Sequence, residues 1–233
     1  MAIAFNQSFG TSESGSANSL SLTNKTCAGS DRLLLVAISH GIWNGGSTVS
    51  SLTYAGVSLT QLGPYFSYNG DGRRLSLWYL IAPSTSANQT LSVSFSGTSY
   101  CSLTAVQYTG VDQTSPFTTP QTMDDSASPG SVSCTSDRDG SWMVAFAQSS
   151  NAGLSISSGA TSRVTAITPN YAYMMDSNAT VASGASNTIN FTWGSGGAAA
   201  MGAMIRPPAS GPASVKTVDG LAIASVKNIN GLA

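Results

Sequence analysis

Along most of this chain, apolar and polar residues alternate with a period of two. The segment Leu-Ser-Val-Ser-Phe from Leu91 to Phe95 is an example. This is the pattern of a β-strand that buries one face. No segment has the apolar spacing of a long amphipathic helix. The pattern therefore predicts an all-β protein.

Short strands separated by Gly, Asn, Ser and Pro clusters predict an antiparallel β-sandwich of jelly-roll-like type. A Pro-containing loop at residues 115–130 divides the predicted strands into two groups. Before the loop they are residues 2–6, 20–26, 32–40, 50–54, 57–62, 74–81, 89–96 and 102–108. After it they are residues 131–135, 141–148, 162–167, 171–176, 188–193 and 199–206.

The two groups of strands repeat one another. Cys27-Ala-Gly-Ser-Asp-Arg precedes an apolar strand, and so does Cys134-Thr-Ser-Asp-Arg. The alternating segment at Leu91 is echoed by Ile-Asn-Phe-Thr-Trp from Ile189. The order is kept, so we infer an internal duplication. The two units could share one core or form two small sandwiches, and we favour a shared core.

The domain organisation follows from these patterns. We expect a β-sandwich body over residues 1–207, with duplicated units at about 20–112 and 130–207. A Pro-rich stretch at residues 208–213 predicts an extended linker, because proline removes donors and stiffens the chain. Residues 214–233 form a separate tail.

The tail contains two copies of one short sequence repeat. It reads Ser-Val-Lys-Thr-Val-Asp-Gly-Leu-Ala from Ser214 and Ser-Val-Lys-Asn-Ile-Asn-Gly-Leu-Ala from Ser225. The Asp-Gly and Asn-Gly steps favour tight type I′ turns between strands. The eleven-residue period also fits a right-handed helical coil, which the glycines and β-branched residues disfavour.

So short a tail buries too little apolar surface to order alone. We expect it to pack on the body, on sister chains or on a larger partner. Our preferred interpretation is a homo-oligomer, with a trimer as the first expectation, in which paired tails cover apolar side chains and strand edges. The expected assembly residues are Val215, Val218, Leu221, Ile223, Val226, Ile229 and Leu232.

Composition narrows the function. Hydrophobic residues make up 41% of the chain but charged residues only 8%, against about 25% charged in ordinary globular proteins. Such surfaces are typical of extracellular β proteins and virion shells. The net charge of −1, without a basic cluster, predicts no nucleic-acid partner. No apolar run has the length of a membrane span, so no membrane partner is expected.

The first residues show neither a basic segment nor an apolar run, so no secretory signal is expected. We therefore expect an outward-facing protein made in the host cytoplasm and located on a virion surface. An extracellular domain is the alternative.

Candidate chemistry is sparse. With one histidine and three cysteines that lack a C-x-x-C pair, a zinc site is not expected. At most one disulfide can form among Cys27, Cys101 and Cys134, and buried free thiols are the expected alternative. His40 ends an apolar strand, and we interpret it as a structural residue with satisfied hydrogen bonds. Asp137 and Asp139 are expected to be solvated turn residues rather than calcium ligands. We expect no cofactor, no catalytic residues and no enzymatic activity; glycoside hydrolysis by paired acids is a third alternative.

Aromatic residues on Gly/Asn-rich loops are better candidates for ligand binding. Such rings can stack on a sugar while nearby carboxylates and amides bind its hydroxyls. The alternative is that these rings close the open end of the sandwich. The candidate ligand-binding residues are Trp43, Tyr65, Tyr68 and Asp71.

Four segments carry a resemblance to known proteins: residues 31–37, 49–60, 74–83 and 105–112. They resemble a β-sandwich module of bacterial surface proteins and of tailed-bacteriophage structural proteins. The tail resembles the Val-Lys-x-Val-x-Gly repeats that close many phage fibre and decoration proteins. The resemblance implies a virion head-fibre, decoration or tail-fibre-like subunit with other virion proteins as partners. The alternative is a carbohydrate-binding adhesin module with surface glycans as ligands.

Overall fold

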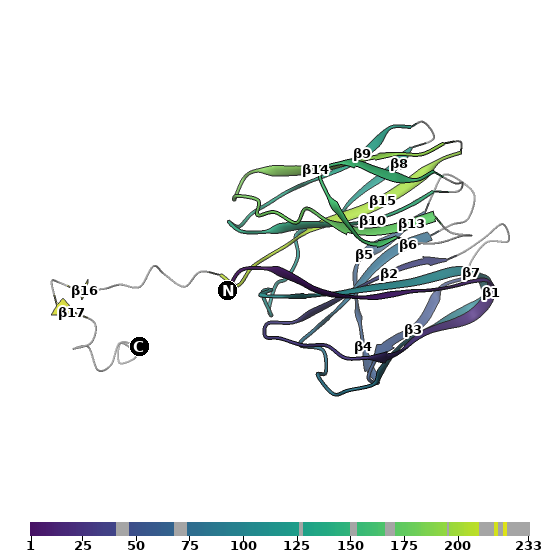
Figure 1. Ribbon diagram of the computed structural model, residues 1–233, viewed down its shortest axis with the longest axis horizontal. Helices are drawn as coiled ribbons and strands as arrows, with labels where there is room; N and C mark the ends of the chain where they lie inside the picture. Colours follow the sequence, from purple (N-terminus) through teal and green to yellow (C-terminus); the bar gives the residue numbers. More distant parts are fainter. Residues whose placement is uncertain are drawn as a thin grey trace.

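A computed structural model describes residues 1–40, 47–67, 74–125, 128–149, 153–165, 171–194, 196–209, 217–218 and 221–222. Every regular element in these ranges is a β-strand, and all strand pairs are antiparallel. The predicted all-β class is confirmed (Figure 1). This part of the chain contains no helix long and apolar enough to cross a membrane.

The strands follow one another with short connections. In the first half they are β1 (Ala4–Lys25), β2 (Leu33–His40), β3 (Val49–Tyr54), β4 (Val57–Ser58), β5 (Thr60–Ser67), β6 (Arg74–Ile81) and β7 (Gln89–Thr109). In the second half they are β8 (Gln121–Asp125), β9 (Gly130–Thr135), β10 (Trp142–Ser149), β11 (Ser155–Ser158), β12 (Thr161–Thr165), β13 (Tyr171–Asp176), β14 (Ser186–Thr192) and β15 (Ala198–Ile205). Two short tail strands are β16 (Thr217–Val218) and β17 (Leu221–Ala222).

The strand pairing repeats between the halves. In the first half, the C-terminal part of β7 pairs with β2, and its N-terminal part pairs with β3. The long β1 pairs along both parts of β7. The resulting orders β5-β6-β2-β7-β1 and β3-β7-β1 match the orders β12-β13-β10-β15-β8 and β11-β14-β9 of the second half. This repeated order agrees with the duplication that the sequence predicts.

The strands stack as four layers with three apolar cores (Figure 1). Each half has its own core between its two layers, and a third core lies between the two inner layers. All eight residues of β2 are buried, because Leu33 and Leu35 face the shared core while Leu34 and Val36 face the core of the first half. The structure thus combines a shared core with two small sandwiches.

Some predicted strand bounds are wrong. The two predicted strands at 2–6 and 20–26 are parts of one strand, β1, which begins at Ala4 and ends at Lys25. The two predicted strands at 89–96 and 102–108 are likewise one strand, β7. The stretch of β1 between its two predicted parts is rich in Ser and Gly and shows no apolar alternation. Its strand conformation comes from pairing with β7, which a local pattern does not reveal.

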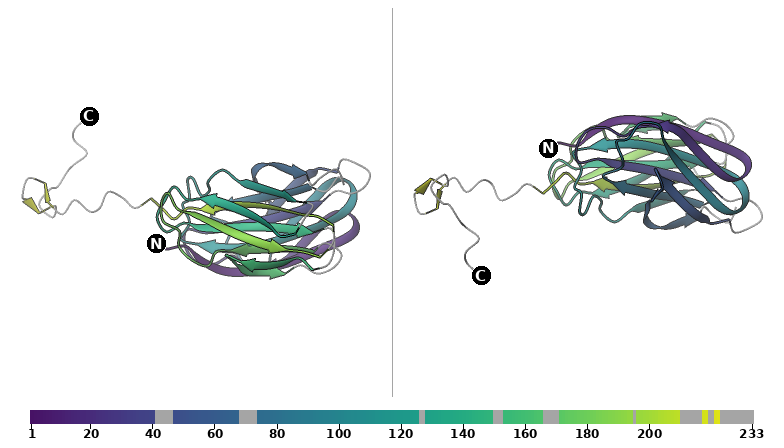
Figure 2. Two further views of the ribbon diagram at one scale, coloured as in Figure 1. Left: turned by 90° about the horizontal axis from the view of Figure 1, so that it is seen from above. Right: turned by 90° about the horizontal axis from the view of Figure 1, so that it is seen from below.

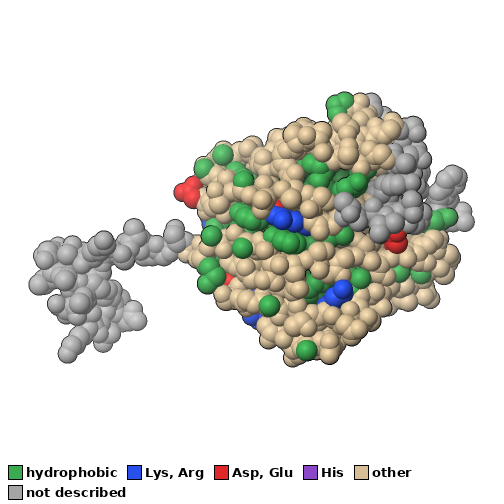
Figure 3. Space-filling view, in the orientation of Figure 1, with side chains coloured by type: hydrophobic (Ala, Val, Ile, Leu, Met, Phe, Trp, Pro, Cys, Tyr) green, Lys and Arg blue, Asp and Glu red, His purple; other side chains and the backbone are tan. Residues whose placement is uncertain are grey.

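The outward positions of the two outer layers carry mainly Ser, Thr and Asn side chains. Leu91, Val93 and Phe95 of β7 face the core, whereas Ser92 and Ser94 alternate with them. Figure 3 shows few charged side chains on the face it presents, with apolar side chains scattered among the uncharged polar surface. The low charge content is therefore also a property of the folded surface.

The described end of the body lies beside the N-terminus. Met1 and Ala2 line the same surface depression as Pro207, Pro208 and Ala209, and both chain segments occupy one end of the molecule in Figure 2.

In the tail, Val218 pairs with Leu221, so that only Asp219 and Gly220 separate the paired positions. This register is the one that the Asp-Gly step of the first repeat predicts.

Candidate functional site

Tyr65 is the one candidate ligand-binding residue that the structure describes, and it belongs to an aromatic cluster at one end of the first half. Its ring lies edge-on to His40, with centroids 5.8 Å apart. The Phe95 ring also packs on His40, with centroids 5.4 Å apart. The Arg74 guanidinium lies 5.9 Å from the Tyr65 ring centroid and donates a 3.2 Å hydrogen bond to the Ser47 carbonyl.

His40 is the last residue of β2, and only 1% of its surface is exposed. Neither ring nitrogen has a hydrogen-bond partner among the described residues. The prediction of a strand-end position is therefore confirmed, but among the described residues the ring lacks the full set of hydrogen bonds that was predicted, although the Ser47 backbone interacts with it. The neighbours are aromatic rings from positions 65 and 95, which sequence order does not place beside a strand end.

The surroundings of His40 disfavour the protonated, positively charged form of its ring. Burial is the larger cause and the positive charge of Arg74 the smaller, and together they lower the pKa of His40 to about 4. An interaction with the Ser47 backbone, the smallest of the three causes, raises the pKa and opposes them only in part. The imidazole is thus neutral at pH 7 and contacts no described hydroxyl or carboxylate that it would activate as a base.

The remaining candidate ligand-binding residues, Trp43, Tyr68 and Asp71, lie outside the described residues, so the loop site stays a prediction. Tyr65 is half-buried, and its ring is engaged by His40 and Arg74. This contact agrees with the alternative that rings close the open end of the sandwich.

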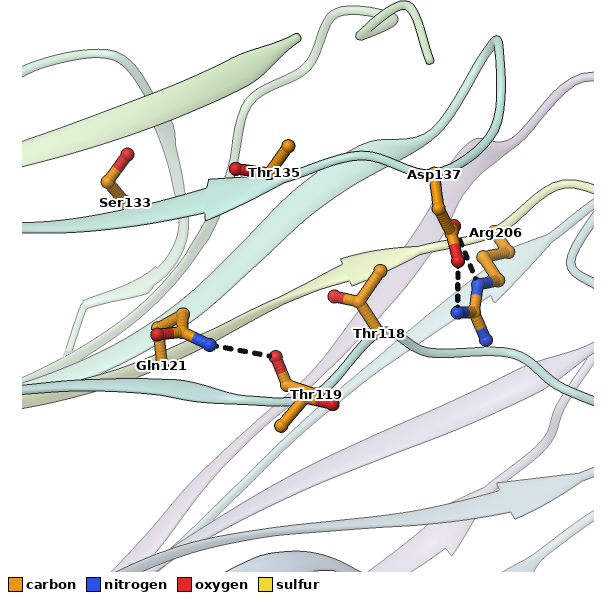
Figure 4. A pocket seen from close by; sticks show the side chains of 7 residues that line it. All are labelled: Thr118, Thr119, Gln121, Ser133, Thr135, Asp137 and Arg206. Carbon is orange, nitrogen blue, oxygen red and sulfur yellow. Dashed lines mark hydrogen bonds and ion pairs between the residues drawn. The ribbon is translucent and has the colours of Figure 1, made fainter. Parts of the chain in front are cut away.

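A polar groove in the second half was not expected from the sequence. It has a volume of about 400 Å³ and lies where β8 and β9 form the edges of their sheets. Figure 4 shows its side chains projecting from segments far apart in the sequence. The lining residues are Thr118, Thr119, Gln121, Ser133, Thr135, Asp137 and Arg206.

An ion pair closes one end of this groove. Arg206 donates from Nε to Asp137 Oδ1 at 2.9 Å and from Nη2 to Asp137 Oδ2 (Figure 4). These bonds are the main cause that lowers the pKa of the Asp137 carboxyl. The expectation of a purely solvated Asp137 is therefore wrong, although half of this side chain is exposed.

The groove hydroxyls are largely engaged with the protein itself. Thr118 Oγ1 accepts a 3.0 Å hydrogen bond from the Met204 backbone, and Ser133 Oγ accepts one of 2.9 Å from Thr188. The carboxyl of Asp139, which lines the depression beside the N-terminus, accepts a 2.8 Å hydrogen bond from the Ser183 backbone. The described residues contain no group of three or more His, Cys, Asp or Glu side chains placed to hold a metal ion. Thr118 and Ser133 therefore already have hydrogen-bond partners within the protein.

The three cysteines are buried and free of disulfide bonds. Burial raises the pKa of Cys101 to about 11 and that of Cys134 to about 12. Burial also raises the pKa of Cys27. Because the thiolate is the reactive form, these cysteines have the properties of structural residues.

A buried polar group joins the two halves of the body. Asp176, which is fully buried, accepts a 2.8 Å hydrogen bond from the Tyr108 hydroxyl of the first half. Arg163 of the second half donates to both oxygens of the same carboxylate, at 2.7 and 2.9 Å. The Arg163 guanidinium also lies 4.3 Å from the ring centroid of Phe5. This cluster fixes how the two inner layers sit on each other.

Comparison with known proteins adds no relative: no family model matches this chain, and no curated protein or solved structure shows significant similarity to it. The resemblance to phage structural proteins therefore stays an expectation.

Proposed function

We propose that this protein is an outward-facing structural subunit of a phage virion, of the head-fibre, decoration or tail-fibre type, which assembles through its C-terminal repeats. The observation that supports this proposal is the β16–β17 pair, in which the first repeat takes the register of a two-residue hairpin. The second repeat carries the same pattern around its Asn-Gly step.

A two-stranded hairpin is at best marginally stable alone in water. Sister tails that add strands to it would supply backbone partners and bury the apolar side chains of both repeats. The assembly we propose is a homo-oligomer, and we take a trimer as its first form to test. The body then remains free to face outward with its charge-poor surface. This function needs no cofactor, no nucleic acid and no catalytic residue.

Truncation tests the proposal. A chain that ends after Pro212 is expected to keep the circular dichroism of the full protein but to become monomeric in light scattering. A second truncation after Ala224 keeps the first repeat and is expected to give a weaker oligomer, because one repeat buries less surface. An unchanged oligomer mass after removal of both repeats would contradict the proposed role of the tail.

A second candidate function is carbohydrate binding as an adhesin module. The specific observation in its favour is the uncharged hydroxyl and amide surface of the outer layers, since hydroxyl groups can both donate to and accept from a sugar. Binding to a glycan array tests it. Loss of binding in Trp43→Ala would assign the site to the predicted loops.

A further inference from the structure

The outward side chains of the outer layer of the first half form a regular grid of hydroxyl groups. Ser21 of β1 is opposite Ser92 of β7, which is opposite Thr53 of β3. The next row consists of Ser19, Ser94 and Ser51 in the same order of strands. We call these six residues the first hydroxyl face.

The outer layer of the second half repeats this arrangement. Its central strand β14 presents Thr188 opposite Ser133 of β9, and Ser186 opposite Thr135. Asn190 lies between Ser131 of β9 and Ser158 of β11. We call these residues the second hydroxyl face.

Sheet geometry makes the spacing of both grids regular. Neighbouring strands lie about 4.8 Å apart, and residues on the same face of one strand lie about 6.7 Å apart. Neither grid contains an Asp, Glu, Lys or Arg side chain. Each face is therefore an uncharged lattice of groups that both donate and accept hydrogen bonds.

Neighbouring side chains fix the hydroxyl groups by hydrogen bonds but do not use all of their donor and acceptor sites. Thr53 and Ser92 are 3.2 Å apart, Thr188 donates to Ser133 at 2.9 Å, and Thr135 lies 2.8 Å from Ser186. A pair of hydroxyls has two donors and four acceptor sites, and one mutual bond uses one of each. The Thr53–Ser92 and Thr135–Ser186 pairs thus keep one donor and three acceptor sites each. Ser133 also donates to the Asn187 carbonyl at 3.4 Å, so the Thr188–Ser133 pair offers acceptor sites only. Fixing the side chains lowers the entropy lost on binding.

We propose that the two hydroxyl faces bind a neutral polysaccharide laid across the strands. Sugar hydroxyls match the donors and acceptors of the grid, and the absence of charge matches an uncharged polymer. An acidic polysaccharide would lose hydration on these faces without gaining a counter-charge. This inference rests on the second candidate function and does not depend on the tail.

The two hydroxyl faces lie on opposite sides of the four-layer body. One is the outward side of the layer that contains β3, and the other is the outward side of the layer that contains β14 (Figure 1). A single molecule therefore presents two equivalent surfaces that point away from each other. Because single hydroxyl contacts are weak, binding depends on their number, and display of many copies on one particle would raise the avidity further.

The test measures binding of the full-length protein to soluble β-glucan, mannan and dextran, with polygalacturonate as an acidic comparison. The double variant Ser51→Lys/Ser133→Lys places a bulky charge in each face and is expected to weaken binding about tenfold or more. The matched variant Ser51→Thr/Ser133→Thr keeps both hydroxyls and should bind as the natural protein does. Ser86→Lys, in an exposed loop, adds the same charge away from both faces and should have no effect.

The outcomes separate the site from the function. If the natural protein binds none of the neutral polymers, both the inference and the carbohydrate-binding candidate are overturned. If it binds and the double lysine variant binds equally well, while Trp43→Ala does not, the function stands and the hydroxyl faces are not its site. Stronger binding to polygalacturonate than to the neutral polymers would also overturn the proposal.

Discussion

At the scale of single residues, His40 shows most clearly how the fold changes the chemistry of a side chain. The sequence indicates its place at a strand end, next to apolar residues. Its lowered pKa depends on burial among Tyr65 and Phe95 and on the charge of Arg74, which come from other strands. Local sequence therefore predicts that this histidine is structural but not that it is held neutral.

This environment predicts a loss of stability in mild acid. The pKa of His40 falls from 6.5 in the unfolded chain to about 4 in the folded one, so the unfolded chain binds the proton first. The stabilising effect is complete above pH 6.5 and is lost as the pH falls toward 4, by at most about 3 kcal/mol. Urea unfolding at pH 7.5 and pH 4.5 measures it.

The control for this prediction is His40→Phe, which fills the same aromatic cluster without a titrating group. It should remove most of the change between the two pH values. Asp112 and Asp137, whose pKa values are lowered by arginine contacts, lose their effect only below their ordinary pKa of 3.8. Glu13, whose pKa is raised by burial, acts in the opposite direction. An equal pH dependence in His40→Phe would show that other groups cause it.

At the scale of elements, the sequence predicts strands well where one face is apolar and poorly where pairing alone holds the strand. The bounds of β6 and β13 agree with the predicted residues 74–81 and 171–176. β8 lies in the predicted loop because Gln-Thr-Met-Asp-Asp has no alternation. Of the side chains described in this strand, only Met123 is buried in a core. The hydroxyl faces were missed for a related reason: alternating serines are visible in the sequence, but their alignment across strands needs the register.

Glycines in the turns of the second half differ in how closely a neighbouring backbone approaches them. Gly159, between β11 and β12, and Gly184, before β14, both have positive φ angles of 85° and 79°. A Cβ at Gly159 would overlap the Thr188 carbonyl oxygen, whereas nothing lies near one at Gly184. We expect Gly184→Ala to cost about 1 kcal/mol of unfolding free energy and Gly159→Ala about 3 kcal/mol, because only the latter must also move a backbone. Equal losses in urea unfolding would show that the φ angle alone decides.

At the scale of the whole molecule, the duplicated halves pack face to face through equivalent strands. β2 and β10 occupy the same place in the two pairing orders, and the side chains of Ser39 and Gln148 are hydrogen-bonded across the shared core. The sequence indicates two units with the same strand order. It does not indicate which faces meet, because β2 and β10 are apolar on both sides and either face could cover a core.

The shared core predicts that the two halves unfold together. It contains Leu35 and Leu77 of the first half with Phe146 and Met201 of the second, so neither half can open without exposing the apolar surface of the other.

Asp176→Ala would leave the Arg163 cation without its carboxylate partner beside Tyr108 and should cost about 3–5 kcal/mol of unfolding free energy. Asp137→Ala removes an equally direct arginine contact at the surface and should cost about 1 kcal/mol or less. Intrinsic fluorescence and far-ultraviolet circular dichroism should give one common transition in urea, which Asp176→Ala moves as a whole. Separate transitions for the two probes, or equal losses in both variants, would mean that the halves are stacked without being energetically coupled.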